Sequence, residues 1–77
     1  MTIVSALARV DIPRIAETKQ RLSRLPGVEV QSTVDPGKLA VVIEGASIDA
    51  THHVLTQQVA TTDGVLAVWP IYMEEEE

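Results

Sequence analysis

Apolar residues are concentrated in four short runs along the chain, at residues 3–10, 28–31, 38–44 and 65–72. The first run is rich in β-branched and aliphatic side chains, and the second, VEVQ, alternates apolar and polar residues as a half-buried strand does. The fourth, VLAVWPIY, is uncharged throughout, so its pattern predicts a strand without fixing which side chains face the core. We therefore expect four β-strands.

The segment after the first run carries the signals of a helix that starts near Asp11 and ends at Pro26-Gly27. The Asp11 carboxylate is expected to cap the first turn, where Pro13 is tolerated because the first amides of a helix have no intrahelical partner. Apolar side chains then recur on one side of the helix, at Ile15, Leu22 and Leu25. Glycine suits the turn that follows a helix, so Gly27 is expected to end it.

A second helix is predicted over residues 47–61. Ser47 is the expected N-cap, and Asp49 places a carboxylate in the first turn, where the helix dipole favours it. Its apolar stripe consists of Ile48, Leu55 and Val59. Turn signals at residues 35–37 and 62–64 separate the remaining elements, and the first of these joins the second and third strands into a hairpin.

The resulting order, βαββαβ, predicts an α+β fold of the ferredoxin-like, split βαβ type. With right-handed crossovers this fold is a four-stranded antiparallel sheet in the order 4-1-3-2, with both helices on one face. The fourth strand then lies at an edge, which is where a proline such as Pro70 is tolerated. We place a single domain at residues 1–73 and an acidic C-terminal tail at residues 74–77.

Alternation along each strand divides the side chains between the helix-covered face and the open face of the sheet. The positions predicted to face the helices are Val4, Ala6, Ala8, Val28, Val30, Leu39, Val41, Ile43, Val65, Ala67, Trp69 and Ile71. Those predicted on the open face are Ser5, Leu7, Arg9, Ala40, Val42, Glu44, Leu66, Val68, Pro70 and Tyr72. An exposed apolar patch of this kind usually marks an interaction site. A partner with an apolar segment next to positive charge and a second copy of the chain fit it equally well.

Charge and composition narrow the range of partners. Four of the eleven acidic residues are the C-terminal glutamates, so residues 1–73 carry seven acidic residues against six basic ones. A nucleic-acid partner is not expected for so acidic a chain. The sequence has no apolar stretch long enough to span a bilayer and no basic start of a secretory signal, so we expect a cytoplasmic protein without stable membrane insertion.

The residues that would carry catalysis or bind a metal do not form the required patterns. The chain has no cysteine, and His52 and His53 are adjacent, so on a helix they point about 100° apart rather than toward one ion. No serine or aspartate is placed with a histidine as a nucleophile with its base. We therefore expect neither an enzyme nor a cofactor or metal site.

Three motifs together resemble the NapD family, the cytoplasmic chaperones of periplasmic nitrate reductase. They are LPGVEV at residues 25–30, GKLAVVIE at 37–44 and DGVLAVWPIY at 63–72, the last followed by acidic residues. The resemblance covers nearly the whole chain and departs at Trp69-Pro70, where a small and then an aliphatic residue would be expected. It implies a binding protein that holds the twin-arginine signal peptide of the molybdenum-containing catalytic subunit and delays export until the cofactor is loaded.

On this resemblance the signal peptide would lie on the open face. Its apolar segment would be bound by apolar side chains of the sheet, while Glu29, Glu44 and the C-terminal glutamates attract its arginine pair. The predicted binding residues are Ser5, Leu7, Arg9, Ala40, Val42, Glu44, Leu66, Val68 and Tyr72. The chain would act as a monomer or weak homodimer. The alternative is a metabolite-sensing regulatory domain of the ACT kind, which shares the βαββαβ order.

Overall fold

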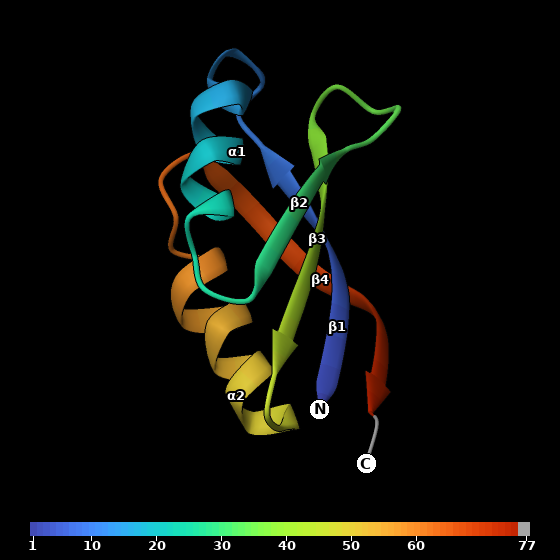
Figure 1. Cartoon of the computed structure of the whole chain (residues 1–77). Coiled ribbons are helices and arrows are strands. Elements are labelled where there is room, and N and C mark those ends of the chain that lie inside the picture. Colours follow the sequence, from blue (N-terminus) through green and yellow to red (C-terminus); the bar gives the residue numbers. More distant parts are fainter. Residues whose placement is uncertain (76–77) are drawn as a thin grey trace.

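The computed structural model of the chain describes residues 1–75, and its elements follow the predicted βαββαβ order (Figure 1). The elements are β1 (Thr2–Val10), a 3₁₀ turn η1 (Ile12–Arg14), α1 (Ile15–Ser23), β2 (Val28–Ser32), β3 (Lys38–Gly45), α2 (Ile48–His53), a π-helical segment η2 (Val54–Val59) and β4 (Val65–Glu75).

The four strands form one antiparallel sheet in the order β2-β3-β1-β4. Both helices lie on the same side of this sheet, and the other side is left open (Figure 1). The ferredoxin-like fold, the strand order and the edge position of β4 are thus confirmed. Among the described residues, no helix is long and apolar enough to cross a bilayer.

The core lies between the sheet and the helices, as the alternation along the first three strands predicts. Leu39, Val41 and Ile43 of β3 are fully buried, and they meet Leu22 of α1 and Val59 of η2 in the same cluster. Val4, Ala6, Ala8 and Val28 belong to this cluster too, and Val30 packs against it. Complete burial of such a side chain is worth about 1.5–3 kcal/mol, so this layer supplies most of the stability of so small a fold.

The helix starts and ends follow the sequence signals only in part. Ser47 caps α2 as predicted, because the Ala50 amide donates to its Oγ at 3.1 Å. The Asp11 side chain makes no capping bond, which corrects the prediction: the chain enters α1 through η1, where the Arg14 amide donates to the Asp11 carbonyl at 2.9 Å. The second half of the predicted second helix is π-helical, and no turn or proline signal in the sequence marks that change.

The structure corrects the predicted facing of β4. Cross-strand partners share a face of the sheet, and Val68 pairs with Ala8 while Trp69 pairs with Leu7. Val68 therefore lies on the helix side, where it packs against the core, and Trp69 lies on the open face. By the same pairing, Pro70 lies on the helix side opposite Ala6 and Ala67 lies on the open face opposite Arg9. All four assignments are the reverse of those predicted.

Two β-bulges cause this reversal. The pairing of β4 with β1 shifts between Arg9 and Val10 and again between Ser5 and Ala6, which leaves Leu66 and Ile71 without a partner on β1. Each extra residue changes the phase of the strand by one position, so the first bulge reverses the facing and the second restores it. Val65 and Tyr72, which lie outside the two bulges, therefore face as predicted.

β4 continues to Glu75, beyond the predicted end of this strand at Tyr72. Glu74 pairs with Ile3 and Glu75 with Thr2, so the start of the predicted acidic tail is part of the sheet. The last two residues of that tail, Glu76 and Glu77, lie outside the described residues.

Candidate functional site

The middle of the open face is apolar and consists of two rows of cross-strand neighbours. In one row Leu7 of β1 lies between Ala40 of β3 and Trp69 of β4. In the next, Ser5 lies between Val42 and Tyr72. Trp69 is 37% exposed and Tyr72 is 60% exposed, although each has a large aromatic side chain whose burial would be favourable. These six residues, Ser5, Leu7, Ala40, Val42, Trp69 and Tyr72, are called the apolar centre below.

One end of the open face is acidic. Ile3 lies between Glu44 on β3 and Glu74 on β4, and Glu29 on β2 is the neighbour of Val42. None of these three carboxylates has an ion-pair partner within residues 1–75. Glu29, Glu44 and Glu74 are called the acidic end.

A hollow of about 410 Å³ opens beside the acidic end, and Glu29, Val42 and Glu44 form part of its lining. Its shape depends on Gly27, which has a φ of 75° and approaches β3 so closely that a Cβ would lie 2.6 Å from the Glu44 carbonyl oxygen. The Glu44 amide in turn donates to the Gly27 carbonyl at 2.8 Å. The loop after α1 is thereby held against the end of β3, which fixes this wall of the hollow.

The opposite end of the open face is basic. Arg9 on β1 and Lys38 on β3 are direct cross-strand partners, an arrangement of like charges that costs stability. Lys38 is relieved by Asp35, whose carboxylate is 3.6 Å from its ammonium group. Arg9 has no ion pair within residues 1–75. Arg9 and Lys38 are called the basic end.

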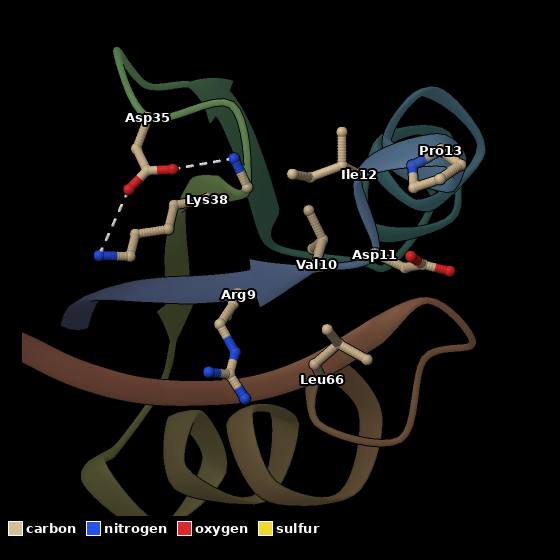
Figure 2. Close-up of a pocket in the computed structure, with 9 residues that line it drawn as sticks. Arg9, Val10, Asp11, Ile12, Pro13, Asp35, Lys38 and Leu66 are labelled. Atoms are coloured by element: carbon tan, nitrogen blue, oxygen red, sulfur yellow. Dashed lines mark hydrogen bonds and ion pairs between the residues drawn. The ribbon is translucent and has the colours of Figure 1, made fainter.

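A second hollow, of about 460 Å³, adjoins the basic end (Figure 2). Its apolar wall contains Ile12 of η1, 56% exposed, and Leu66, 60% exposed, which lie on either side of Val10 in this view. The first bulge of β4 is what places Leu66 there. Arg9, Lys38, Asp11 and Asp35 supply the charged part of the lining, two cations and two carboxylates. Asp35 also accepts a hydrogen bond of 2.9 Å from the Gly37 amide, which orders the hairpin turn.

The structure brings most of the predicted binding residues together. Ser5, Leu7, Ala40, Val42 and Tyr72 meet in the apolar centre, while Arg9 and Glu44 lie at its two ends. Leu66 lies apart from the centre, in the hollow at the basic end. Val68 does not belong to the face at all, since it packs against the core on the helix side.

Two further residues belong to this surface. Alternation alone assigns Trp69 to the core, and the sequence pattern indicates Ile12 only as part of a helix start. A signal for Trp69 is its own neighbour, because a proline in a strand often accompanies a bulge. For Ile12 the sequence holds no comparable signal.

Elsewhere in the described part of the chain, ionic contacts serve the fold. On the helix side, Arg14 donates hydrogen bonds to both carboxylate oxygens of Asp63, one of them at 3.2 Å. These bonds and the positive charge hold the pKa of Asp63 below its usual value. No three His, Cys, Asp or Glu side chains within residues 1–75 could jointly hold a metal ion. The chemistry that the open face itself offers is an apolar surface between opposite charges.

Comparison with known proteins gives one family and one fold. The sequence model described as NapD protein matches residues 1–77. The solution structure of the E. coli Tat proofreading chaperone protein NapD is 30% identical, with a TM-score of 0.82, over 97% of this chain and 79% of that one. No curated protein matches the chain.

Two more distant structures share the fold alone. The crystal structure of a Thermus thermophilus protein is 22% identical, with a TM-score of 0.85, over 100% of this chain and 96% of that one. E. coli AsnC is 18% identical, with a TM-score of 0.77, over 97% of this chain and 52% of that one. The architecture thus occurs in proteins with very different sequences.

Proposed function

The chain belongs to the NapD protein family, and we propose that it is a Tat proofreading chaperone, a cytoplasmic binding protein rather than an enzyme. Its ligand is the twin-arginine signal peptide of the catalytic subunit of periplasmic nitrate reductase, which it holds until the cofactor of that subunit is loaded. The observation that carries this proposal is the open face, where an apolar centre adjoins three carboxylates without ion-pair partners in residues 1–75.

A twin-arginine signal peptide complements this surface, because it has two adjacent arginines followed by an apolar stretch. The apolar stretch loses water against Leu7, Trp69 and Tyr72, and this loss drives association. Partly exposed aromatic side chains of this size commonly supply a large share of the binding free energy of an interface. The arginines form charge-assisted hydrogen bonds with carboxylates of the acidic end.

The two kinds of contact have different roles. Carboxylates at the rim of an interface mainly accelerate encounter and set orientation, and salt weakens them. The apolar contacts are less sensitive to salt and mainly determine how long the complex lasts. A chaperone that must hold a leader during cofactor loading and then release it needs both.

The family match over the full chain supports the chaperone over a metabolite-sensing domain of the ACT kind. A second copy of the chain remains the competing occupant of the open face. Peptide binding and self-association would then use the same six residues of the apolar centre. The calorimetric titration described next distinguishes the two occupants.

The decisive experiment is calorimetric titration of the protein with the leader peptide of the nitrate reductase catalytic subunit from the same genome. Trp69→Ala is expected to weaken binding about 30-fold or more, in line with the loss of one interface hot spot. Val34→Ala is the matched control, because Val34 is an exposed apolar residue at the tip of the β2–β3 hairpin. Circular dichroism establishes that both variants are folded.

Unchanged affinity of folded Trp69→Ala would overturn the assignment of the open face. So would a protein that sediments as a dimer and has no affinity for the peptide. Replacing both peptide arginines by glutamine is expected to weaken binding more at low salt than at high salt. Equal weakening at all salt concentrations would contradict the role given to the acidic end.

A further inference from the structure

The two ends of the open face carry opposite charges, although both lie on one sheet. Ile3, Ser5, Leu7 and Arg9 occupy successive positions of the open face on β1, which runs from the acidic end to the basic end. At about 3.3 Å per residue, the six steps from Ile3 to Arg9 span about 20 Å. This exceeds the Debye length of about 8 Å at physiological ionic strength, so the charges of the two ends do not cancel.

We propose that the bound signal peptide lies on this face in one direction only, with its arginine pair over the acidic end and the far end of its apolar stretch in the hollow at the basic end. This inference rests on the proposed function and adds an orientation to it. The hollow lined by Ile12, Leu66 and Arg9 is accordingly a second binding site, distinct from the apolar centre.

The acidic end suits the arginine pair because its carboxylates have no ion-pair partner within residues 1–75 and can accept hydrogen bonds. Glu29 and Glu44 line the 410 Å³ hollow, which is large enough to admit a guanidinium group, and their two carboxylates outnumber the one cation of the lining, Arg24. A carboxylate and a guanidinium can form two parallel hydrogen bonds, and these fix the arginine in place as well as attract it.

The basic end is a poorer site for the arginine pair than the acidic end, because the carboxylates of Asp11 and Asp35 there are balanced by Arg9 and Lys38. It accepts the far end of the apolar stretch instead. A reversed peptide would bring two arginines against Arg9 and Lys38, which already face each other across β1 and β3. In the proposed direction, Ile12 and Leu66 contact the apolar stretch instead, and Arg9 donates hydrogen bonds to peptide carbonyl groups that the sheet leaves unpaired.

The length of the ligand fits the distance between the two ends. About six extended residues, or about thirteen helical ones, cover 20 Å. The apolar region of an export signal typically has about 7–15 residues. An extended stretch anywhere in this range therefore reaches both ends, whereas a helical stretch reaches both only near the upper limit of the range.

The direction can be measured by paramagnetic broadening of backbone amide signals. The chain has no cysteine, so a nitroxide attached to a single cysteine in the peptide is the only label. One peptide carries the label just before the arginine pair, and a second carries it at the end of the apolar stretch. The first is expected to broaden Gly27 and Gly45, and the second to broaden Gly37 and Leu66.

The opposite pattern, or equal broadening at both ends by both peptides, would overturn the inference while calorimetry still records binding. Absence of binding for either peptide would instead overturn the proposed function. In Arg9→Glu both ends attract arginines, so the first label is expected to broaden Gly37 as well. Lys19→Glu makes the same change of charge on α1 and is expected to leave the original pattern. If Arg9→Glu also keeps that pattern, Arg9 does not set the direction.

Discussion

β3 and β4 both pair with β1, but the chain enters them in different ways. β3 begins at a local turn, in which Asp35 accepts a hydrogen bond from the Gly37 amide and pairs with Lys38, and its register with β1 is continuous. β4 follows Gly64, which is packed against Thr18 of α1, and its register with β1 is interrupted twice. A strand whose register is set by the turn before it keeps simple alternation of its side chains. A strand whose register is set by contacts with distant elements can depart from that alternation.

The largest difference between the two strands is expected at the glycines that precede them, Gly64 before β4 and Gly37 before β3. Gly64 has a φ of 100°, and a Cβ there would overlap Oγ1 of Thr18, whereas the nearest atoms to a Cβ at Gly37 are at 3.6 Å. A strained φ alone costs about 1–3 kcal/mol, so with the overlap Gly64→Ala is expected to lose about 3 kcal/mol or more. Gly37→Ala should change stability by less than about 1 kcal/mol. Urea unfolding measures both, and equal losses would contradict this account of how β4 is fixed.

A smaller difference is expected between the valines of the two strands. Val41 is fully buried, so Val41→Ala should cost about 2 kcal/mol, and Val68→Ala, at a position partly buried against the core, should cost about 1 kcal/mol. Val42→Ala is the matched control from the open face and should cost less than either. Thermal unfolding of the three variants measures the order. If Val68→Ala behaves like Val42→Ala, then Val68 faces the open side and the first bulge is absent in solution.

The smallest expected effect concerns the ion pair of Arg14 and Asp63, which ties the turn before β4 to η1. Because Arg14 lowers the pKa of Asp63 in the folded protein, this pair stabilises the fold above the usual carboxyl pKa of 3.8. The contribution is lost as the pH falls from there through the lowered value. Both side chains are exposed, so the effect should be slight and should shrink in high salt.

Melting temperatures of the wild type and Asp63→Asn should therefore differ most near neutral pH and converge in acid. The Arg14→Gln background supplies the control, because Asp63 then lacks the main cause of its lowered pKa and keeps only the weaker attraction of Arg21. A difference that persists at low pH, or one of equal size in the Arg14→Gln background, would assign the effect of Asp63 to something other than this pair.

The fold could be predicted because its turns have strong local signals. Pro26-Gly27, residues 35–37 and residues 62–64 mark the element boundaries, and Gly27 and Gly64 do adopt the positive φ that favours glycine. Alternation then predicts the facing of the first three strands correctly, because their polar residues fix which set of alternating side chains faces away from the helices. It therefore places Leu7, Ala40 and Val42 on the open face.

The facing of β4 could not be obtained in the same way. Every residue from Val65 to Tyr72 is uncharged, so no side chain in the run prefers water strongly enough to fix the phase. On the helix side, Pro70 and Met73 line a small hollow together with Ile48 and Leu55 of the second helical region, so the facing of β4 goes with its position against elements that are distant in the sequence. Leu55, which lines this hollow, is part of the π-helical segment η2. The local sequence alone indicates neither the hollow nor the π-helical geometry.

The bulged edge of β4 has a consequence for the unliganded protein. An edge strand of eleven residues beside an exposed apolar face could recruit a further strand from a neighbouring molecule and begin a growing aggregate. Two bulges, a proline without an amide hydrogen, and the carboxylates of Glu74 and Glu75 all oppose such pairing. The same irregularities that turn Trp69 to the open face therefore also disfavour strand addition between neighbouring molecules.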